Sequence, residues 1–128
     1  MMAVLAALVF VALALIVHRM VKRKPGGVMD AVQLKKQIDA GENLLIVDLR
    51  DEPEFKKGHI AGAVNIPIGE FEKRIGEVAG SRKKLALICK SAGKSTKAHG
   101  ILATKNIAAS IVQGGMDQWQ QNSFPTES

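Results

Sequence analysis

The sequence predicts an α/β fold with a mostly parallel sheet, preceded by one membrane-spanning helix. Two continuous apolar runs of strand length, residues 44–47 and 85–88, indicate strands that are buried on both faces, as in parallel sheets. Segments with helical periodicity alternate with the strands, which is typical of α/β folds. Residues 1–17 carry no charged or polar side chain, and this pattern predicts a membrane helix.

We assign residues 1–21 to a transmembrane anchor. Arg19, Lys22 and Arg23 follow the apolar run, where they can reach toward the lipid headgroups. A buried core helix is disfavoured because no face of the segment is polar, and a cleaved signal peptide is disfavoured because the positive charges follow the apolar run. Since basic residues beside a span tend to stay in the cytoplasm, we expect a single-pass protein of the inner or plasma membrane, with the N-terminus outside and the domain cytoplasmic. The expected partners include the lipid bilayer and, as one option, a membrane protein.

The elements of the domain follow in order along the chain. Residues 22–27 form a basic linker that ends in a Pro-Gly-Gly breaker. Val28 and Met29 begin a strand, and Asp30 is a typical N-cap for a helix that continues to Ala40. The pattern then predicts a strand at 44–47, a helical turn over 52–57, a strand at 64–65, a helix over 71–78, a strand at 85–88, a helix over 96–104, a strand at 110–112 and a helix over 116–121.

The charge and cysteine content exclude several classes of function. The chain of 128 residues has a net charge of +6, but most of the excess precedes Pro25, after which 14 basic residues face 12 acidic ones. No basic stripe alternates with aromatic residues, so we expect no nucleic-acid partner. A single cysteine, Cys89, excludes an internal disulfide and thiolate metal sites, and the three histidines lack the spacing of metal ligands. We expect neither a metal nor another cofactor.

Cys89 is the candidate nucleophile. It stands where a buried strand ends and a helix begins a few residues later, and ligands bind at this edge of open α/β sheets. No proline interrupts residues 90–95, so each of them can offer a backbone N–H, and a loop curled before a helix would point several of these donors at the sulfur. These donors, the helix dipole and the cations Lys90 and Lys94 favour the thiolate, which is the reactive form of cysteine. The alternative is a buried cysteine that acts only as a small apolar residue.

Several motifs, read together, resemble one family. They are DLRDEPEF at residues 48–55, GHIAGAVNIP at residues 58–67, CKSAGKS at residues 89–95, and GGMDQW at residues 114–119 with Pro125 beyond. This set is similar to the signature of the rhodanese-like sulfurtransferases. The resemblance covers residues 28–125 and leaves 126–128 as a short C-terminal tail. It implies a five-stranded parallel sheet flanked by helices, and a Cys89 that carries a persulfide.

The residues around Cys89 have separate expected roles. Substrate binding is expected of the loop residues Lys90, Ser91, Ala92, Gly93, Lys94 and Ser95. Asp48, Arg50 and His59 are expected to support the site through hydrogen bonds and not to transfer protons. The loop departs from the family pattern twice. Ala92 replaces a glycine, which strains the backbone if a positive φ is needed there, and Lys94 replaces an arginine that would bind an anion with two hydrogen bonds.

The expected function is the transfer of a sulfane sulfur. Attack of the Cys89 thiolate on a small anionic donor such as thiosulfate would give a persulfide, and a thiol or another thiophilic acceptor would take the outer sulfur. One alternative is a non-catalytic or persulfide-carrying module that docks on a membrane partner. Phosphatase chemistry is less favoured, because related phosphatases have a loop one residue longer that ends in arginine. A nucleotide-binding P-loop at residues 93–95 is disfavoured because Ile88 stands where its first glycine belongs.

Overall fold

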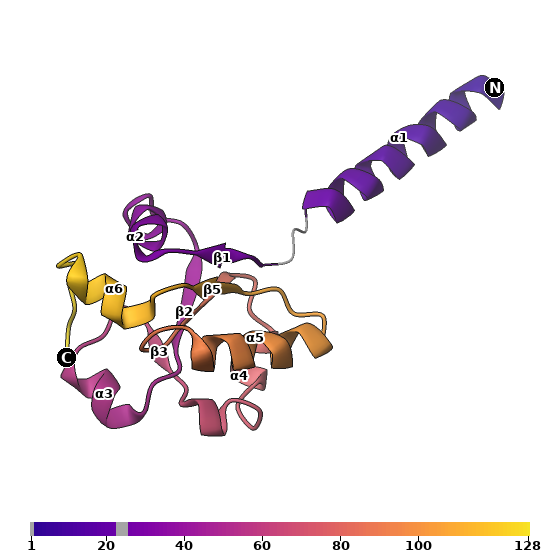
Figure 1. The fold of residues 1–128 in the computed structure, drawn as a ribbon. Coiled ribbons are helices and arrows are strands. Elements are labelled where there is room, and N and C mark those ends of the chain that lie inside the picture. The colour runs from indigo at the N-terminus through magenta and orange to yellow at the C-terminus, as the bar shows by residue number, and fades with distance from the viewer. Residues whose placement is uncertain (1, 23–25) are drawn as a thin grey trace.

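The computed structural model describes residues 2–22 and 26–128, and the side chains of residues 2–16 and 26–128. Figure 1 shows α1 apart from a sheet that is flanked by helices. The elements are α1 (Met2–Lys22), β1 (Val28–Met29), α2 (Ala31–Asp39), β2 (Leu44–Asp48), α3 (Glu52–Lys57), β3 (Val64–Asn65), a 3₁₀ turn (Ile68–Glu70), α4 (Gly76–Ala79), β4 (Lys84–Ile88), α5 (Gly93–Thr104), β5 (Ser110–Val112) and α6 (Gly115–Gln121).

The five strands form one parallel sheet in the order β1-β5-β4-β2-β3, which confirms the expected α/β architecture. The central pair is β2 and β4, with Leu44 opposite Lys84 and Asp48 opposite Ile88. These strands are the two continuous apolar runs of the sequence, and both faces of the sheet are covered at this point. Because the strands are parallel and in register, their carboxyl ends lie at the same edge of the sheet.

Successive residues of β4 face opposite sides of the sheet and enter two separate cores. Leu85 and Leu87 pack with buried residues of α4 and α5, whereas Ala86 and Ile88 pack with buried residues of α2 and α6. Trp119, which is 1% exposed, closes the second core and donates its Nε1–H to the carbonyl of Pro125 at 3.0 Å. The sheet is therefore held rigidly on both faces beneath the edge where β4 ends.

Local sequence signals set several element boundaries. Asp30 caps α2 as expected: its side chain accepts from the N–H of Gln33, and the Gln33 side chain accepts from the N–H of Asp30. The expected helix over 71–78 is wrong in extent, because only Gly76–Ala79 forms an α-helix after a run of turns. Residues 71–75 form consecutive turns instead, in which the N–H of Arg74 donates to the carbonyl of Glu70 at 3.0 Å. The helix after Cys89 begins earlier than expected, at Gly93.

The expected membrane anchor and localisation need correction. No helix in the ranges 2–22 and 26–128 is long and apolar enough to cross a membrane. The uninterrupted apolar stretch of α1, residues 2–17, rises only about 24 Å as a helix, whereas the hydrocarbon core of a bilayer is about 30 Å thick. This overturns the expected single-pass localisation with the N-terminus outside and the domain cytoplasmic. The bilayer and a membrane protein are accordingly not supported as partners.

Two details of the expected anchor and linker fall beyond the described part of the chain. The side chains of Arg19, Lys22 and Arg23, which were expected to reach the headgroups, lie outside the described residues. Residues 23–25 of the expected linker at 22–27 also lie outside them.

Candidate active site

Cys89 directly follows β4, at the edge where the carboxyl ends of the central strands meet. Its partner strand ends at Asp48, which is in register with Ile88. The Cys89 side chain is 2% exposed and belongs to the core between the sheet and α5. The fold therefore places the one cysteine of the chain at the ligand-binding edge expected from the sequence.

The loop after Cys89 presents a run of backbone N–H groups without protein acceptors. Within the described part of the chain, no acceptor takes a hydrogen bond from the N–H groups of residues 90–95. Those of Gly93, Lys94 and Ser95 form the first turn of α5, and the first bonded N–H is that of Thr96, which donates to the carbonyl of Ala92 at 2.9 Å. A helix N-terminus with unpaired donors binds anions well.

The start of α6 fixes the carbonyl side of the same loop. The N–H of Met116 donates to the carbonyl of Cys89 at 2.8 Å, and the N–H of Asp117 donates to the carbonyl of Lys90 at 3.0 Å. Gly115 makes this approach possible, because a Cβ there would stand 2.3 Å from the Cys89 carbonyl oxygen. Sequence reasoning assigned no role to Gly115 in the site, although a Gly-Gly pair before a helix is a signal of close backbone approach.

Ser95 is the buried polar residue of the loop. Its side chain is 0% exposed, and its hydroxyl has no hydrogen-bond partner among the described residues. By contrast, the hydroxyl of the next residue, Thr96, donates to the carbonyl of Ala92 at 2.8 Å. An unsatisfied buried hydroxyl costs roughly 1–3 kcal/mol, and the Ser95 hydroxyl is therefore available as a hydrogen-bond donor to a bound group.

At Ala92 and Lys94 the loop departs from the family pattern, and the structure shows the backbone angle at the first and the side-chain contact at the second. Ala92 has φ −149°, so the backbone does not enter the left-handed region that would strain it. Lys94 points its Nζ to 3.9 Å from Oδ1 of Asp51, and both side chains are substantially exposed. Such a long, solvated ion pair contributes little, and it leaves Lys94 able to turn toward an incoming anion.

Asp48 and Arg50 form a buried pair under the site. The Arg50 Nη2 lies 2.8 Å from Oδ2 of Asp48 and also donates to the carbonyl of Gly58 at 2.8 Å. The Nε of Arg50 donates to Oδ1 of the same carboxylate at 3.0 Å. Asn65, which sequence reasoning left without a role, donates from its Nδ2 to the carbonyls of Asp48 and Arg50 at 3.0 and 2.8 Å. This network supports the bracing role expected of Asp48 and Arg50.

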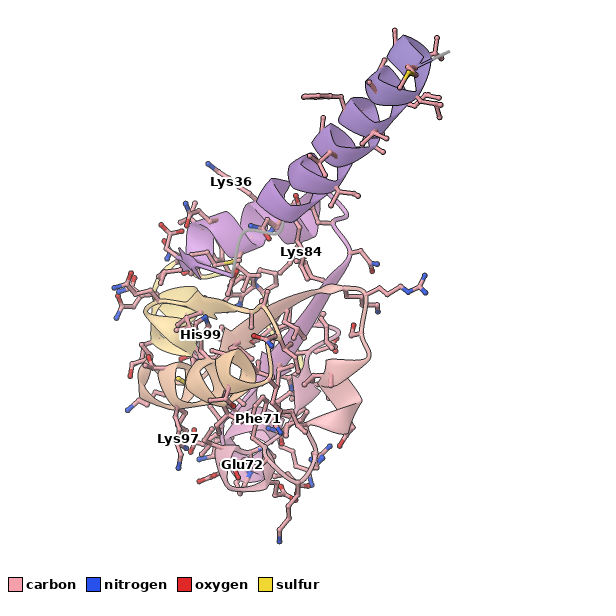
Figure 2. All side chains as sticks on the ribbon, turned by 90° about the vertical axis from the view of Figure 1, so that its right-hand side faces the viewer. Lys36, Phe71, Glu72, Lys84, Lys97 and His99 are labelled. Carbon is pink, nitrogen blue, oxygen red and sulfur yellow. The ribbon has the colours of Figure 1, made fainter. Side chains whose placement is uncertain are left out.

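His59 packs against α3, and its neighbour Gly58 accepts the hydrogen bond from Arg50. Its ring stacks on Phe55 with centroids 3.7 Å apart, and its Nδ1 lies 2.8 Å from the carbonyl of Phe55. Its backbone exchanges two hydrogen bonds of 2.8 Å with Glu127. His59 thus holds the C-terminal residues, and the expected tail at 126–128 is hydrogen-bonded to the domain. His99, labelled in Figure 2, belongs to α5, and its Nε2 lies 3.4 Å from the carbonyl oxygen of Gly26.

A cavity of about 380 Å³ opens beside the Cys89 loop. It is bordered by the end of β2, the start of α3, the loop and the start of α6. Its lining residues are Arg50, Asp51, Glu54, Lys90, Lys94, Met116, Asp117 and Gln120. Among the described residues no group of three or more His, Cys, Asp or Glu could hold a metal ion. Lys90 and Lys94 of the loop line this cavity, whereas Cys89 itself is buried and does not line it.

Comparison with known proteins gives a consistent result. The sequence model of one family, the rhodanese-like domain, matches residues 30–122 of this chain. YtwF of Bacillus subtilis, provisionally named a sulfurtransferase, is 30% identical over 92 residues, which cover 72% of this chain and 88% of YtwF. YrkF of the same organism, provisionally named a sulfur carrier protein, is 36% identical over 86 residues. These cover 66% of this chain but only 46% of YrkF, so the chain spans less than half of that relative.

Solved structures agree with the sequence relatives. The crystal structure of a rhodanese-related protein from Thermoplasma volcanium superposes with a TM-score of 0.70 at 27% identity. The match covers 78% of this chain and 96% of the other. The similarity therefore spans almost the whole of that protein.

Proposed function

The chain belongs to the family of rhodanese-like domains, and on this basis we propose that it is a sulfurtransferase in which Cys89 carries the transferred sulfur as a persulfide. The observation that carries the proposal is the run of unpaired N–H groups at residues 90–95, which directly follows the cysteine. A persulfide ends in an anionic sulfur, and such donors stabilise developing negative charge without reorganisation. Relatives named as a sulfurtransferase and a sulfur carrier support the same chemistry.

In the first step, the Cys89 thiolate attacks the outer sulfur of a donor such as thiosulfate. A new S–S bond forms to Cys89, the bond between the two sulfur atoms of the donor breaks, and sulfite leaves with the electron pair. In the second step, a thiophilic acceptor attacks the terminal sulfur, and the Cys89 thiolate leaves. Charge and electrons balance in both steps, so no oxidant, metal or other cofactor is required.

In this proposal the backbone N–H groups, the Ser95 hydroxyl and the Lys94 side chain bind different parts of the substrate. The N–H groups of Lys90, Ser91, Ala92, Gly93, Lys94 and Ser95 surround the anionic sulfur. The Ser95 hydroxyl, in the same helical turn as the free N–H groups, supplies one more donor. Among the described residues Lys94 makes one ion pair, the long contact to Asp51, and it attracts the anionic donor and the departing sulfite. Asp48 and Arg50 keep the end of β2 in place beneath the loop.

Steady-state kinetics test this proposal. Because the sulfur is held covalently between two half-reactions, initial rates with varied thiosulfate and cyanide should give parallel double-reciprocal lines, the signature of ping-pong kinetics. The same preparation should release no phosphate from an aryl phosphate. Intersecting lines, or phosphate release without thiocyanate formation, would contradict the proposed chemistry. The absence of any turnover, with no sulfur on Cys89, would favour the non-catalytic alternative.

A further inference from the structure

Asp51 places a carboxylate beside a cation of the Cys89 loop. Its Oδ1 lies 3.9 Å from the Nζ of Lys94, and both side chains border the same cavity. Two more carboxylates border this cavity, those of Glu54 and Asp117, but in the described ranges neither forms an ion pair with a loop lysine. Asp51 follows β2 and Lys94 lies in the first turn of α5, so the fold alone brings this pair together.

The fold makes little use of the Asp51 carboxylate. Asp51 is the N-cap residue of α3, a position where aspartate usually accepts a hydrogen bond from the first turn of the helix. Within the part of the chain that the structure describes, its side chain makes no such bond, and its one ion pair is the contact with Lys94. The side chain is also 72% exposed. The carboxylate therefore lies by the loop cation instead of capping its own helix.

This carboxylate acts against the attraction that Lys94 offers to an anionic donor. Its negative charge lowers the electrostatic potential beside the loop and so cancels part of the potential of the ammonium group. Because the energy of a donor in this potential is proportional to its charge, a dianion loses about twice as much of the attraction as a monoanion. The backbone N–H groups of residues 90–95, in contrast, are available to both kinds of donor.

We propose that Asp51 is a specificity-determining residue that lowers the reactivity of Cys89 toward doubly charged sulfur donors relative to singly charged ones, an inference that rests on the persulfide function proposed above. The bonds that form and break are the same for both kinds of donor. The outer sulfur bonds to Cys89, and the remainder leaves with the electron pair, as sulfite from thiosulfate or as a sulfinate from a thiosulfonate. Asp51 acts on the donor through its charge and takes no part in bond formation.

Two donors of different charge test this role. Thiosulfate carries two negative charges and benzenethiosulfonate carries one, and intact mass follows the second-order loading of Cys89 from each. Asp51→Asn should load about fivefold faster than the wild type with thiosulfate and about twofold faster with benzenethiosulfonate, the range of one exposed ion pair. In roughly 1 M salt, where the screening length is about 3 Å, both gains should largely disappear.

Glu52→Gln is the matched control. It removes the same charge from the next residue of the chain, but Glu52 pairs with Lys56 at 2.8 Å and is not among the residues that line the cavity. This variant should load at nearly the wild-type rate with both donors.

Several outcomes would overturn the role of Asp51 while leaving the persulfide function standing. They are unchanged or slower loading by Asp51→Asn, equal gains with the two donors, and the same gain in Glu52→Gln. Slower loading would show that the carboxylate holds Lys94 in a productive position. Failure of the wild type and both variants to take sulfur from either donor would instead overturn the function, and the inference with it.

Discussion

At the scale of single residues, the site is defined by one buried thiol and one buried hydroxyl. Cys89 and Ser95 lie at the two ends of the loop, and both side chains are almost fully enclosed. Cysteine is often buried as an apolar residue, so its burial alone indicates nothing. A hydroxyl without a partner is different, because the protein gains nothing from it in the empty state. Under the proposed function, this hydroxyl donates to the anionic sulfur that Cys89 carries.

Replacement of Ser95 by alanine should separate stability from activity. Removing an unsatisfied buried hydroxyl should leave the free energy of unfolding unchanged or raise it by up to about 1 kcal/mol. The rate of sulfur loading should nevertheless fall about tenfold, because one hydrogen bond to the anionic sulfur is lost. Stopped loading reactions read by intact mass, with urea unfolding curves on the same samples, measure the two effects.

The neighbouring hydroxyl provides the control for this variant. Thr96→Ala removes the 2.8 Å hydrogen bond to the carbonyl of Ala92 and should lower stability by about 1 kcal/mol with little change in the loading rate. If Ser95→Ala destabilised the protein and loaded sulfur at the wild-type rate, the Ser95 hydroxyl would have a structural role only.

At the scale of elements, two helices hold the loop from opposite sides. The first turn of α5 supplies unpaired donors, and the start of α6 binds the carbonyls of Cys89 and Lys90. Because the carbonyls of Cys89 and Lys90 point toward α6, the N–H groups of the same two peptide units point away from α6. The arrangement depends on Gly115, which has φ +51° and lies against the loop backbone.

Gly115→Ala should therefore damage the site through the backbone. The new Cβ would meet the carbonyl oxygens of Cys89, Ser91 and Lys90 at 2.3, 2.6 and 2.7 Å, so the loop must move. We expect a loss of about 2 kcal/mol or more in the free energy of unfolding, and a more than tenfold slower sulfur loading. Denaturant unfolding and single-turnover loading would measure both.

Gly100→Ala is the matched control, because Gly100 lies inside α5 and an added Cβ would meet no described atom within 4 Å apart from the backbone of its own helix and its chain neighbours. This variant should be more stable by about 0.5–1 kcal/mol and load sulfur normally. Wild-type loading by Gly115→Ala would show that the contact between α6 and the loop is dispensable.

At the scale of the whole molecule, much of the fold could be predicted from local sequence patterns, such as apolar runs and helix caps. Continuous apolar runs identified β2 and β4, and the capping pattern at Asp30 identified the start of α2. The position of Cys89 at the end of a strand followed from the same runs. These features depend on neighbours a few residues apart, which a sequence displays directly.

Features that depend on distant segments could not be predicted in this way. The contact of Lys94 with Asp51, the support of the loop by Gly115, and the pairing of His59 with Glu127 join residues that only the folded chain brings together. The expected membrane span was wrong for a different reason. The sequence shows both the apolar composition and the length of the run, and the composition was given more weight than the length, which is short for a bilayer.

The most direct test of the account is the mass of the protein after brief exposure to thiosulfate and removal of the excess. The account predicts that the wild-type chain gains one sulfur atom, that cyanide removes it as thiocyanate, and that Cys89→Ser gains none while keeping the wild-type fold by circular dichroism. A wild-type chain that gains no sulfur, or a Cys89→Ser chain that gains as much as the wild type, would contradict it.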